Sequence, residues 1–227
     1  MQPADNHCYP YPHPAVTTDV VVFTIRQRRL QLLLIRRGNS PFQGMWALPG
    51  GFLDIDEDLK ACAQRELAEE TGIDGVYLEQ LYTFGKPGRD PRERVISVAY
   101  YALLPQHVLT EPRAASDADE VAWFPLGELP ELAFDHGEII ARAHRRLADK
   151  LDYSTIAFQF MADRFTLSEL QGVYEAVLEE TLDKRNFRKR ILALGQIEET
   201  GSLRRNGKHR PAREYRIKHP ERVEYIK

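Results

Sequence analysis

The 227-residue chain contains only two cysteines, Cys8 and Cys62, and no long hydrophobic run. Such sparse cysteine does not favour a structural disulfide and is typical of a reducing compartment. The longest apolar run, near residues 20–25, is far shorter than the roughly 20 residues that a membrane-spanning helix needs. Residues 1–16 are polar and contain several prolines, so they lack the apolar stretch of a signal peptide. These absences predict a cytoplasmic protein with no membrane partner.

The abundant residue types predict a folded protein with an uneven distribution of charge. Hydrophobic residues make up 43% of the chain and charged residues 29%, which is enough for packed cores below a well-solvated surface. The net charge is only −3, yet residues 184–227 contain 14 Lys or Arg against 5 Asp or Glu, which leaves −12 for the rest. An acidic body with a basic end predicts two domains, of which the basic one has an anionic polymer as partner.

Three carboxylates, on Glu66, Glu69 and Glu70, are spaced so that a helix would place them on one face. Like charges at this spacing repel each other, and a hard divalent cation such as Mg²⁺ or Mn²⁺ would remove the repulsion by taking their oxygens as ligands. The alternative is an acidic helix face that is simply solvated. The glycines before the helix, Gly72 after it, and Arg65 within it favour the metal site.

Residues 51–73 read GFLDIDEDLKACAQRELAEETGI and resemble the Nudix box, G-x5-E-x7-R-E-U-x-E-E-x-G-U with U aliphatic, at every fixed position. The resemblance implies a Nudix α/β/α sandwich and cleavage of a nucleoside diphosphate linked to another group. It also implies that Mg²⁺ (or Mn²⁺) is held by one backbone carbonyl and three carboxylates, those of Gly50, Glu66, Glu69 and Glu70. Arg65 would orient the carboxylates, and Glu57 would be a secondary acidic partner in catalysis.

The rest of the first half predicts further strands and one helix. Residues 17–37 have the pattern of a β-hairpin, and residues 135–151 carry apolar side chains at helical spacing. We therefore place a first domain at residues 1–152, of which 1–15 form a flexible arm, and a second domain at residues 153–227. Because the helix at residues 135–151 stands between the two domains, we expect it to carry any coupling between them.

A cationic loop joins two predicted strands, residues 78–84 and 95–104. Its four cations are Lys86, Arg89, Arg92 and Arg94. Together they could hold an anionic ligand, and a solvated loop is an equally good alternative on charge alone.

The basic end has the pattern of a folded domain. Residues 166–169 form a helix-capping sequence, followed by apolar residues at helical spacing. A second helix near Asp183 has an apolar and a basic face, and two short strands near residues 196–200 and 214–217 flank a basic tip. This is the order of a winged helix-turn-helix, whose second helix enters the major groove of double-stranded DNA. The alternative is a solvated amphipathic helix beside a charged hairpin.

The candidate DNA contacts lie on the basic helix and on the hairpin. On the helix they are Lys184, Arg185, Asn186, Arg188 and Lys189. On the hairpin they are Arg204, Arg205, Lys208 and Arg210. Arginine can read guanine and asparagine can read adenine, so Arg185, Asn186 and Arg188 are the candidates for sequence specificity.

Four segments, FGKPGRDPRERVISVAY, LAFDH, FTLSELQ and LDKRNFRKRILAL, are together similar to the Nudix-related regulators of NAD metabolism, the NrtR type. Such regulators have a first domain similar to ADP-ribose pyrophosphatases and a winged helix as the second. The resemblance implies a homodimer whose operator binding changes when the first domain binds ADP-ribose or a related nucleotide. It also implies that the ligand is held by Arg89, Asp90, Arg92 and Arg94, with His136 near the site.

Three functions stay open from the sequence. The first is a DNA-binding repressor that senses ADP-ribose. The second is an active Mg²⁺-dependent ADP-ribose pyrophosphatase, giving AMP and ribose 5-phosphate, with an accessory C-terminal domain. The third combines the two, because regulators of this type often have a degraded Nudix box whereas this chain keeps a complete one. Asp117, Asp119 and Glu120 are candidates for the base that activates water, although an ordinary surface acid is the simpler reading of each.

Overall fold

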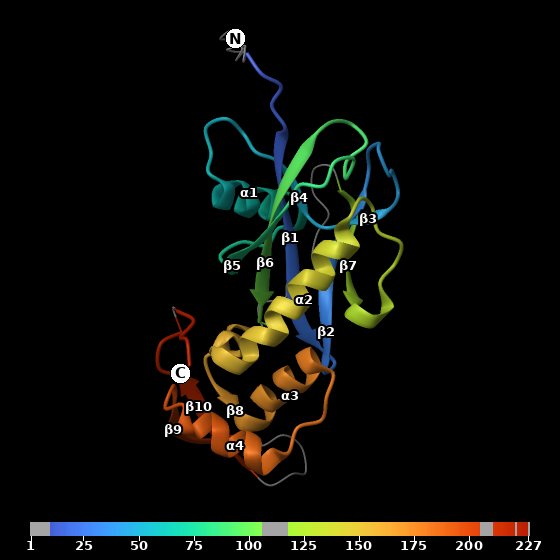
Figure 1. Ribbon diagram of the computed structural model, residues 1–227. Helices are drawn as coiled ribbons and strands as arrows, with labels where there is room; N and C mark the ends of the chain where they lie inside the picture. Colours follow the sequence, from blue (N-terminus) through green and yellow to red (C-terminus); the bar gives the residue numbers. More distant parts are fainter. Residues whose placement is uncertain (1–9, 106–117, 205–210, 221, 227) are drawn as a thin grey trace.

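The computed structural model describes residues 10–105, 118–204, 211–220 and 222–226 (Figure 1). The first part of the chain forms a seven-stranded sheet in the order β3-β2-β1-β6-β5, with β7 paired to β2 and β4 paired to β1. Of the described pairings, β1–β6 is parallel and the others are antiparallel. The strands are β1 (Ala15–Arg26), β2 (Arg29–Arg37), β3 (Trp46–Ala47), β4 (Gly50–Phe52), β5 (Tyr77–Phe84), β6 (Val95–Leu104) and β7 (Ala118–Pro125).

Helices cover both faces of this sheet. Successive side chains of a strand point to opposite faces, and β1 is buried on both. Val20 belongs to the core under α1 (Leu59–Thr71), while its neighbour Val21 belongs to the core under α2 (His136–Tyr153). A short 3₁₀ turn, η2 (Leu126–Glu128), follows β7. The arrangement is the predicted α/β/α sandwich.

The predicted hairpin of residues 17–37 is confirmed. β1 and β2 pair from Phe23 with Leu32 down to Arg26 with Arg29. The two turn residues, Gln27 and Arg28, have φ values of 51° and 61°, which match the right-handed twist of the flanking strands.

Local sequence explains both ends of α1. The Asp58 carboxylate accepts hydrogen bonds from the amides of Lys60 and Ala61 at 2.8 and 2.9 Å, which satisfies donors that have no partner within the helix. Gly72 ends the helix with φ 72°, the left-handed conformation that glycine adopts without steric cost. With Leu67 buried against the sheet, the acidic face of α1 is directed to its edge.

The C-terminal part is a winged helix. It contains η3 (Ile156–Phe160), β8 (Phe165–Thr166), α3 (Leu167–Leu178), α4 (Lys184–Ala193), β9 (Ile197–Arg204) and β10 (Ala212–Ile217), with the strands in the order β8-β10-β9. Thr166 and Glu169 form the predicted capping box at the start of α3. Phe187 and Ile191 bury the apolar face of α4, so its basic face points outward.

The two parts of the chain are packed together, as expected from the absence of a Gly/Ser-rich linker. One hydrophobic cluster runs from the sheet through Leu147 of α2 to Ile191 of α4. His144 Nε2 of α2 lies 2.8 Å from the backbone oxygen of Val177 in α3. Residues 222–226 return to the end of α2, where they make backbone hydrogen bonds. Among the described helices, none is long and apolar enough to cross a membrane.

Candidate functional site

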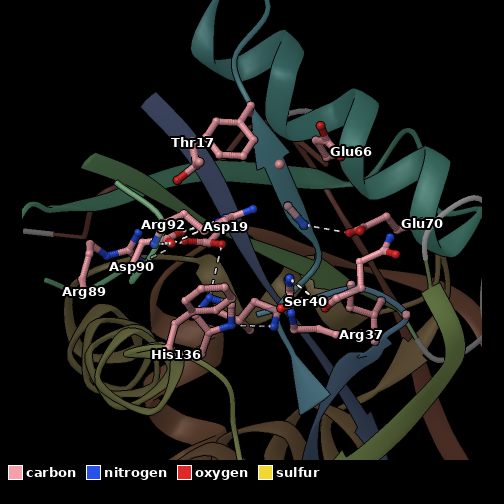
Figure 2. Close-up of a pocket in the computed structure, with 18 of the residues that line it drawn as sticks. Thr17, Asp19, Arg37, Ser40, Glu66, Glu70, Arg89, Asp90, Arg92 and His136 are labelled. Carbon is pink, nitrogen blue, oxygen red and sulfur yellow. Dashed lines mark hydrogen bonds and ion pairs between the residues drawn. The ribbon is translucent and has the colours of Figure 1, made fainter. Parts of the chain in front are cut away.

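A cavity of about 480 Å³ opens at the edge of the sheet where α1, β4 and the start of α2 meet. Its walls come from segments far apart in the chain: β1, β2, β4, α1, the loop before β6, and the first turn of α2. Figure 2 shows the acids of α1 on one side of the cavity and Arg89, Asp90 and Arg92 on the other. The predicted box and part of the predicted cationic loop therefore face each other.

On the α1 side, Glu70 and Glu66 are held against the two glycines of β4. Glu70 Oε2 accepts a hydrogen bond from Gly50 N at 2.8 Å. A β-carbon on Gly51 would lie 2.2 Å from Glu66 Oε1, and one on Gly50 would lie 2.0 Å from Thr18 O. Gly50 must therefore be glycine, because a side chain would collide with the backbone of β1, whereas a side chain at Gly51 would displace the carboxylate of Glu66.

Arg65 organises the acids around it. Its guanidinium donates to Glu57 at 2.6 and 3.1 Å, to Glu66 at 2.7 Å and to Glu69 at 3.2 Å. The hydrogen bonds from Arg65 lower the pKa of Glu57 to about 2. Glu57 thus fixes Arg65, and Arg65 in turn orients the carboxylate of Glu66 beside the cavity.

The acids of the cavity have the chemistry of a divalent-cation site. Burial raises the pKa of Glu70 to about 8, and it also raises the pKa of Glu66. In both cases the cost of burying the charged carboxylate exceeds what its hydrogen bonds give back. Within the described ranges no three His, Cys, Asp or Glu side chains are already clustered in the manner of a metal site. The oxygen donors nevertheless fit a hard cation, which would supply the missing positive charge.

The opposite wall is built around Arg89, whose side chain is buried. Arg89 makes two hydrogen bonds to Asp135, at 2.6 and 2.9 Å, and lies 3.4 Å from Asp19. The Asp19 carboxylate also accepts a hydrogen bond from the hydroxyl of Ser97. This network joins β1, the cationic loop, β6 and the start of α2 across the sheet edge.

His136 is the buried link between this network and β4. Its Nδ1 accepts a hydrogen bond from Leu48 N at 2.9 Å, and its Nε2 lies 3.5 Å from Asp19 Oδ1. Burial lowers the pKa of His136, so the ring is neutral with its proton on Nε2.

Two further arginines and two aromatic rings complete the cavity. Arg92 is paired with Asp90 at 2.7 Å and lies over the rings of Phe52 and Phe134, at 5.0 and 5.8 Å from their centroids. Arg37 lies 4.8 Å from the centroid of Phe134, and burial followed by repulsion from Arg92 lowers its pKa. Cations next to flat rings suit a ligand that combines phosphate with a planar base.

Sequence reasoning missed four of these groups: Asp19, Arg37, Phe52 and Phe134. Asp19 could have been found, because it is a lone acid next to the longest apolar run of the sequence. The structure buries it on β1, where an acid needs partners. Phe52 and Phe134 lie within segments that carry the family resemblance, but nothing in the sequence singled out these two residues or Arg37, since all three reach the cavity only through the pairing of strands and the packing of α2.

Of the predicted ligand residues, the structure places some in the cavity and others outside it. Arg89, Asp90, Arg92 and His136 line the cavity. Lys86 lies instead in a separate groove beside Arg142 and Arg145 of α2, because the loop turns between Lys86 and Arg89. Arg94 donates to Gly85 O at 2.7 Å, which closes the base of the same loop.

The candidate bases receive no support from their positions. Glu120 is exposed, lies 3.7 Å from Arg36, and is not among the residues that line the cavity. Asp117 lies outside the described residues, and the side chain of Asp119 is likewise not described.

Most candidate DNA contacts on α4 are free to meet a partner. Lys184, Arg185, Asn186 and Lys189 are exposed. Arg188 is half-buried, and its Nε has no hydrogen-bond partner among the described residues.

The hairpin candidates differ from those on α4. Arg204 is already engaged by Glu169 at 3.0 Å, by Glu214 at 2.7 Å and by Arg164 O at 3.0 Å. Its guanidinium thus joins the hairpin to α3 and to the residue just before β8. Arg205, Lys208 and Arg210 lie outside the described residues.

Comparison with known proteins supports the two-part architecture. The NUDIX domain family model matches residues 14–143, and the model of the NrtR DNA-binding winged helix domain matches residues 157–217. The ADPR responsive transcriptional repressor NtrR of Acinetobacter baylyi is 41% identical over 209 residues, which cover 91% of this chain and 83% of that protein. The chain belongs to the NrtR family of Nudix regulators.

Solved structures of NrtR proteins agree with this membership. Shewanella oneidensis NrtR, in a crystal structure with a 27mer DNA, is 37% identical with a TM-score of 0.77, over 91% of this chain and 94% of that one. The Nudix domain of the same NrtR, in a cocrystal structure with ADP ribose, is 38% identical with a TM-score of 0.55, over 60% of this chain and 90% of that one.

Proposed function

We propose that this NrtR-family protein is a DNA-binding transcriptional repressor whose Nudix domain binds ADP-ribose or a close relative. The observation that carries the proposal is that one relative, named for ADPR-responsive repression, matches 91% of the chain and therefore both parts of it. The domain division after residue 152 belongs to the same proposal.

The cavity offers groups for the pyrophosphate and for the base of such a ligand. Arg37, Arg89 and Arg92 would neutralise a pyrophosphate, since guanidinium groups bind phosphate oxygens in a bidentate manner. Phe52 and Phe134 present flat apolar surfaces beside these cations, where a planar base can stack.

Glu66 and Glu70 would hold Mg²⁺ or Mn²⁺, with help from Glu69 and the carbonyl of Gly50. When bound, the cation would neutralise pyrophosphate charge and lower the pKa of a water molecule. Arg65 keeps Glu66 oriented through the contacts described above, and Gly51 leaves room for its carboxylate. The backbone amide of Gly50 positions Glu70.

The winged helix would use the exposed face of α4 in the major groove. Arg185 and Asn186 lie at the start of this helix, from which base edges are read, while Lys184 and Lys189 would contact phosphates. A homodimer would present two such helices to two half-sites.

Hydrolysis of ADP-ribose is the second candidate function. It is favoured by the complete Nudix box and by the position of Glu66 and Glu70, whose carboxylates line the cavity opposite Arg89 and Arg92. In this case the products would be AMP and ribose 5-phosphate.

Two assays with the purified full-length protein test these functions. The duplex that binds best is selected from random-sequence DNA, and its dissociation constant is measured by fluorescence anisotropy with and without ADP-ribose. A protein that selects no duplex, or whose affinity for the selected duplex is indifferent to ADP-ribose, would refute ADP-ribose-responsive repression. Release of AMP from ADP-ribose with Mg²⁺ tests hydrolysis, and the Glu70→Gln variant is the control for contaminating activity.

A further inference from the structure

We propose that Arg190, on the basic helix α4, is a coupling residue rather than a DNA contact, and that it transmits the state of the Nudix cavity to the winged helix through α2. This inference rests on the proposed function, because it requires that a ligand in the cavity changes the affinity for DNA.

Arg190 holds the C-terminal end of α2. Its Nη2 donates to Leu151 O at 3.2 Å and to Asp152 O at 3.1 Å, and lies 3.4 Å from the Asp152 carboxylate. The last four carbonyls of a helix have no partner within the helix and carry its negative dipole end, so a guanidinium is well suited to this position. Arg190 therefore joins the helix that would enter DNA to a helix of the Nudix domain.

The other end of α2 is part of the cavity. Asp135 is the N-cap residue of α2, and its carboxylate makes no capping hydrogen bond because it is engaged by Arg89 at 2.6 and 2.9 Å. His136, the first residue of the helix, lines the cavity and accepts from Leu48 N. An anionic ligand that binds the guanidinium of Arg89 would compete with the carboxylate of Asp135. The first turn of α2 would then lose its contact with Arg89.

A single rigid element thus connects the two sites. α2 has 18 residues and a length of about 27 Å. Figure 1 shows it crossing the sheet from the region of β3 to the winged helix. A small shift of its first turn must appear at its last turn, because helices move as stiff bodies within close-packed cores.

The neighbours of Arg190 on α4 serve as a contrast. Arg185 and Lys189 are exposed and, in the described part of the chain, make no hydrogen bond or ion pair with α2. Arg190 is also exposed, with 45% of its side chain accessible, but its Nη2 is turned back to the end of α2. A side chain that only attracts DNA would point away from the protein, whereas Nη2 of Arg190 donates to two backbone carbonyls of α2. The geometry assigns attraction of DNA to Arg185 and Lys189, and coupling to Arg190.

The test measures DNA affinity with and without ADP-ribose for four full-length proteins: wild type, Arg190→Ala, Arg190→Lys and Lys189→Ala. The readout is the coupling ratio, the dissociation constant for DNA with ADP-ribose divided by that without it. The affinity for ADP-ribose itself is measured by calorimetry, and melting curves confirm that each variant is folded.

We expect Arg190→Ala to move the coupling ratio toward one, by on the order of 3- to 10-fold, while the affinity for ADP-ribose stays near that of wild type. Lys189→Ala should weaken DNA binding equally with and without ligand, so its coupling ratio should equal that of wild type. Arg190→Lys keeps the charge and one donor group, so its ratio should lie between those of wild type and Arg190→Ala. It also replaces Arg190→Ala as the deciding variant should the alanine protein fail to fold.

A coupling ratio unchanged by the Arg190 variants would overturn the inference, whether or not their DNA affinity falls. A wild-type ratio of one would instead refute the proposed function, and the inference would fall with it. The two failures are therefore distinguishable within one set of measurements.

Discussion

The carboxylate of Glu70 on α1 is held by the backbone amide of Gly50 on β4, with 2.8 Å between Glu70 Oε2 and Gly50 N. The contact joins the acidic helix to the sheet, and only 8% of Glu70 is exposed. One side chain therefore has two tasks that oppose each other. As the proposed cation ligand it must stay at the cavity, and it must also remain buried where its negative charge is costly.

Glu70→Gln should separate these tasks. The amide oxygen can still accept from Gly50, while the charge is lost. Because burial raises the pKa of Glu70 to about 8, the wild-type carboxylate opposes folding increasingly as the pH rises from about 4.5 to 8. Without divalent cations, we expect the variant to melt a few degrees above wild type at pH 8 and close to it at pH 4.5.

Added Mn²⁺ should raise the melting temperature of wild type and leave that of Glu70→Gln unchanged, because the variant lacks one of the proposed ligands of the ion. Glu138→Gln is the matched control, because Glu138 is an exposed acid of α2. If Mn²⁺ raised the melting temperatures of wild type and Glu70→Gln equally, Glu70 would not be a ligand of the metal.

His136→Asn should make the stability of the protein less dependent on pH between pH 7 and pH 5. Burial lowers the pKa of His136 in the folded protein. Below about pH 6.5 the unfolded chain therefore binds a proton at this residue that the folded chain does not bind, and the free energy of unfolding decreases as the pH drops. An asparagine oxygen can accept from Leu48 N without titrating. Thermal unfolding between pH 7 and pH 5 measures the effect, with exposed His219→Asn as the control. Parallel profiles for wild type and His136→Asn would contradict the assignment.

Lys150→Met should destabilise the protein. Lys150 is buried and donates to both oxygens of Glu79, at 2.7 and 2.8 Å. Burial disfavours the charge of Glu79, yet the hydrogen bonds from Lys150 and Tyr77 prevail and lower its pKa. Breaking a fully buried pair costs roughly 3–5 kcal/mol, and partial exposure of Glu79 reduces our expectation to about 2 kcal/mol.

Urea denaturation measures this loss against Arg216→Met. Arg216 pairs with Glu198 at the surface, where both side chains are exposed, so its replacement should change the free energy of unfolding by less than about 1 kcal/mol. Similar values for the two variants would show that the Lys150–Glu79 pair contributes no more than a surface pair.

Arg92→Ala should weaken ADP-ribose binding on the order of 10- to 100-fold, the usual effect of removing a hydrogen bond to a charged group. Arg92 lines the cavity between two aromatic rings. Lys86→Ala removes a cation of the same loop that lies in the other groove, so the affinity should stay near that of wild type. Isothermal calorimetry compares the two. A larger loss for Lys86→Ala than for Arg92→Ala would show that the ligand occupies the other groove.

Arg185→Ala should weaken DNA binding and also reduce its dependence on salt. A base-reading or phosphate-binding arginine releases counterions, so the slope of log affinity against log salt concentration should decrease by about 1. Arg142→Ala, an exposed arginine on α2, is the control with an equal change in charge. An identical slope for wild type and Arg185→Ala would place the DNA elsewhere.

Much of the architecture was readable from local sequence. The spacing of Glu66, Glu69 and Glu70 fixes one helix face, and Gly72 fixes the end of that helix, whatever the rest of the chain does. The capping box at Thr166 and the apolar face of α4 are equally local. These features depend on residues at most a few turns apart, which is why sequence spacing alone predicted them.

The composition of the cavity was not local. Asp19, Arg37 and Phe134 come from three separate segments, and they meet only because β1 pairs with β2 and α2 packs on the same sheet. Asp19 and Arg89 are 70 residues apart, and no spacing rule connects them.

The sequence by itself determined the acidic helix α1, the two-part order of sandwich and winged helix, and the basic face of α4, because periodicity and capping act within one element. The tertiary structure alone decided which cations serve which purpose. Arg89 turns inward to Asp19 and Asp135 while Lys86 turns away, and Arg190 is hydrogen-bonded to the end of α2 while its exposed neighbour Lys189 is not. The direction of a charged side chain is set by its partners, and here those partners lie far away in the chain.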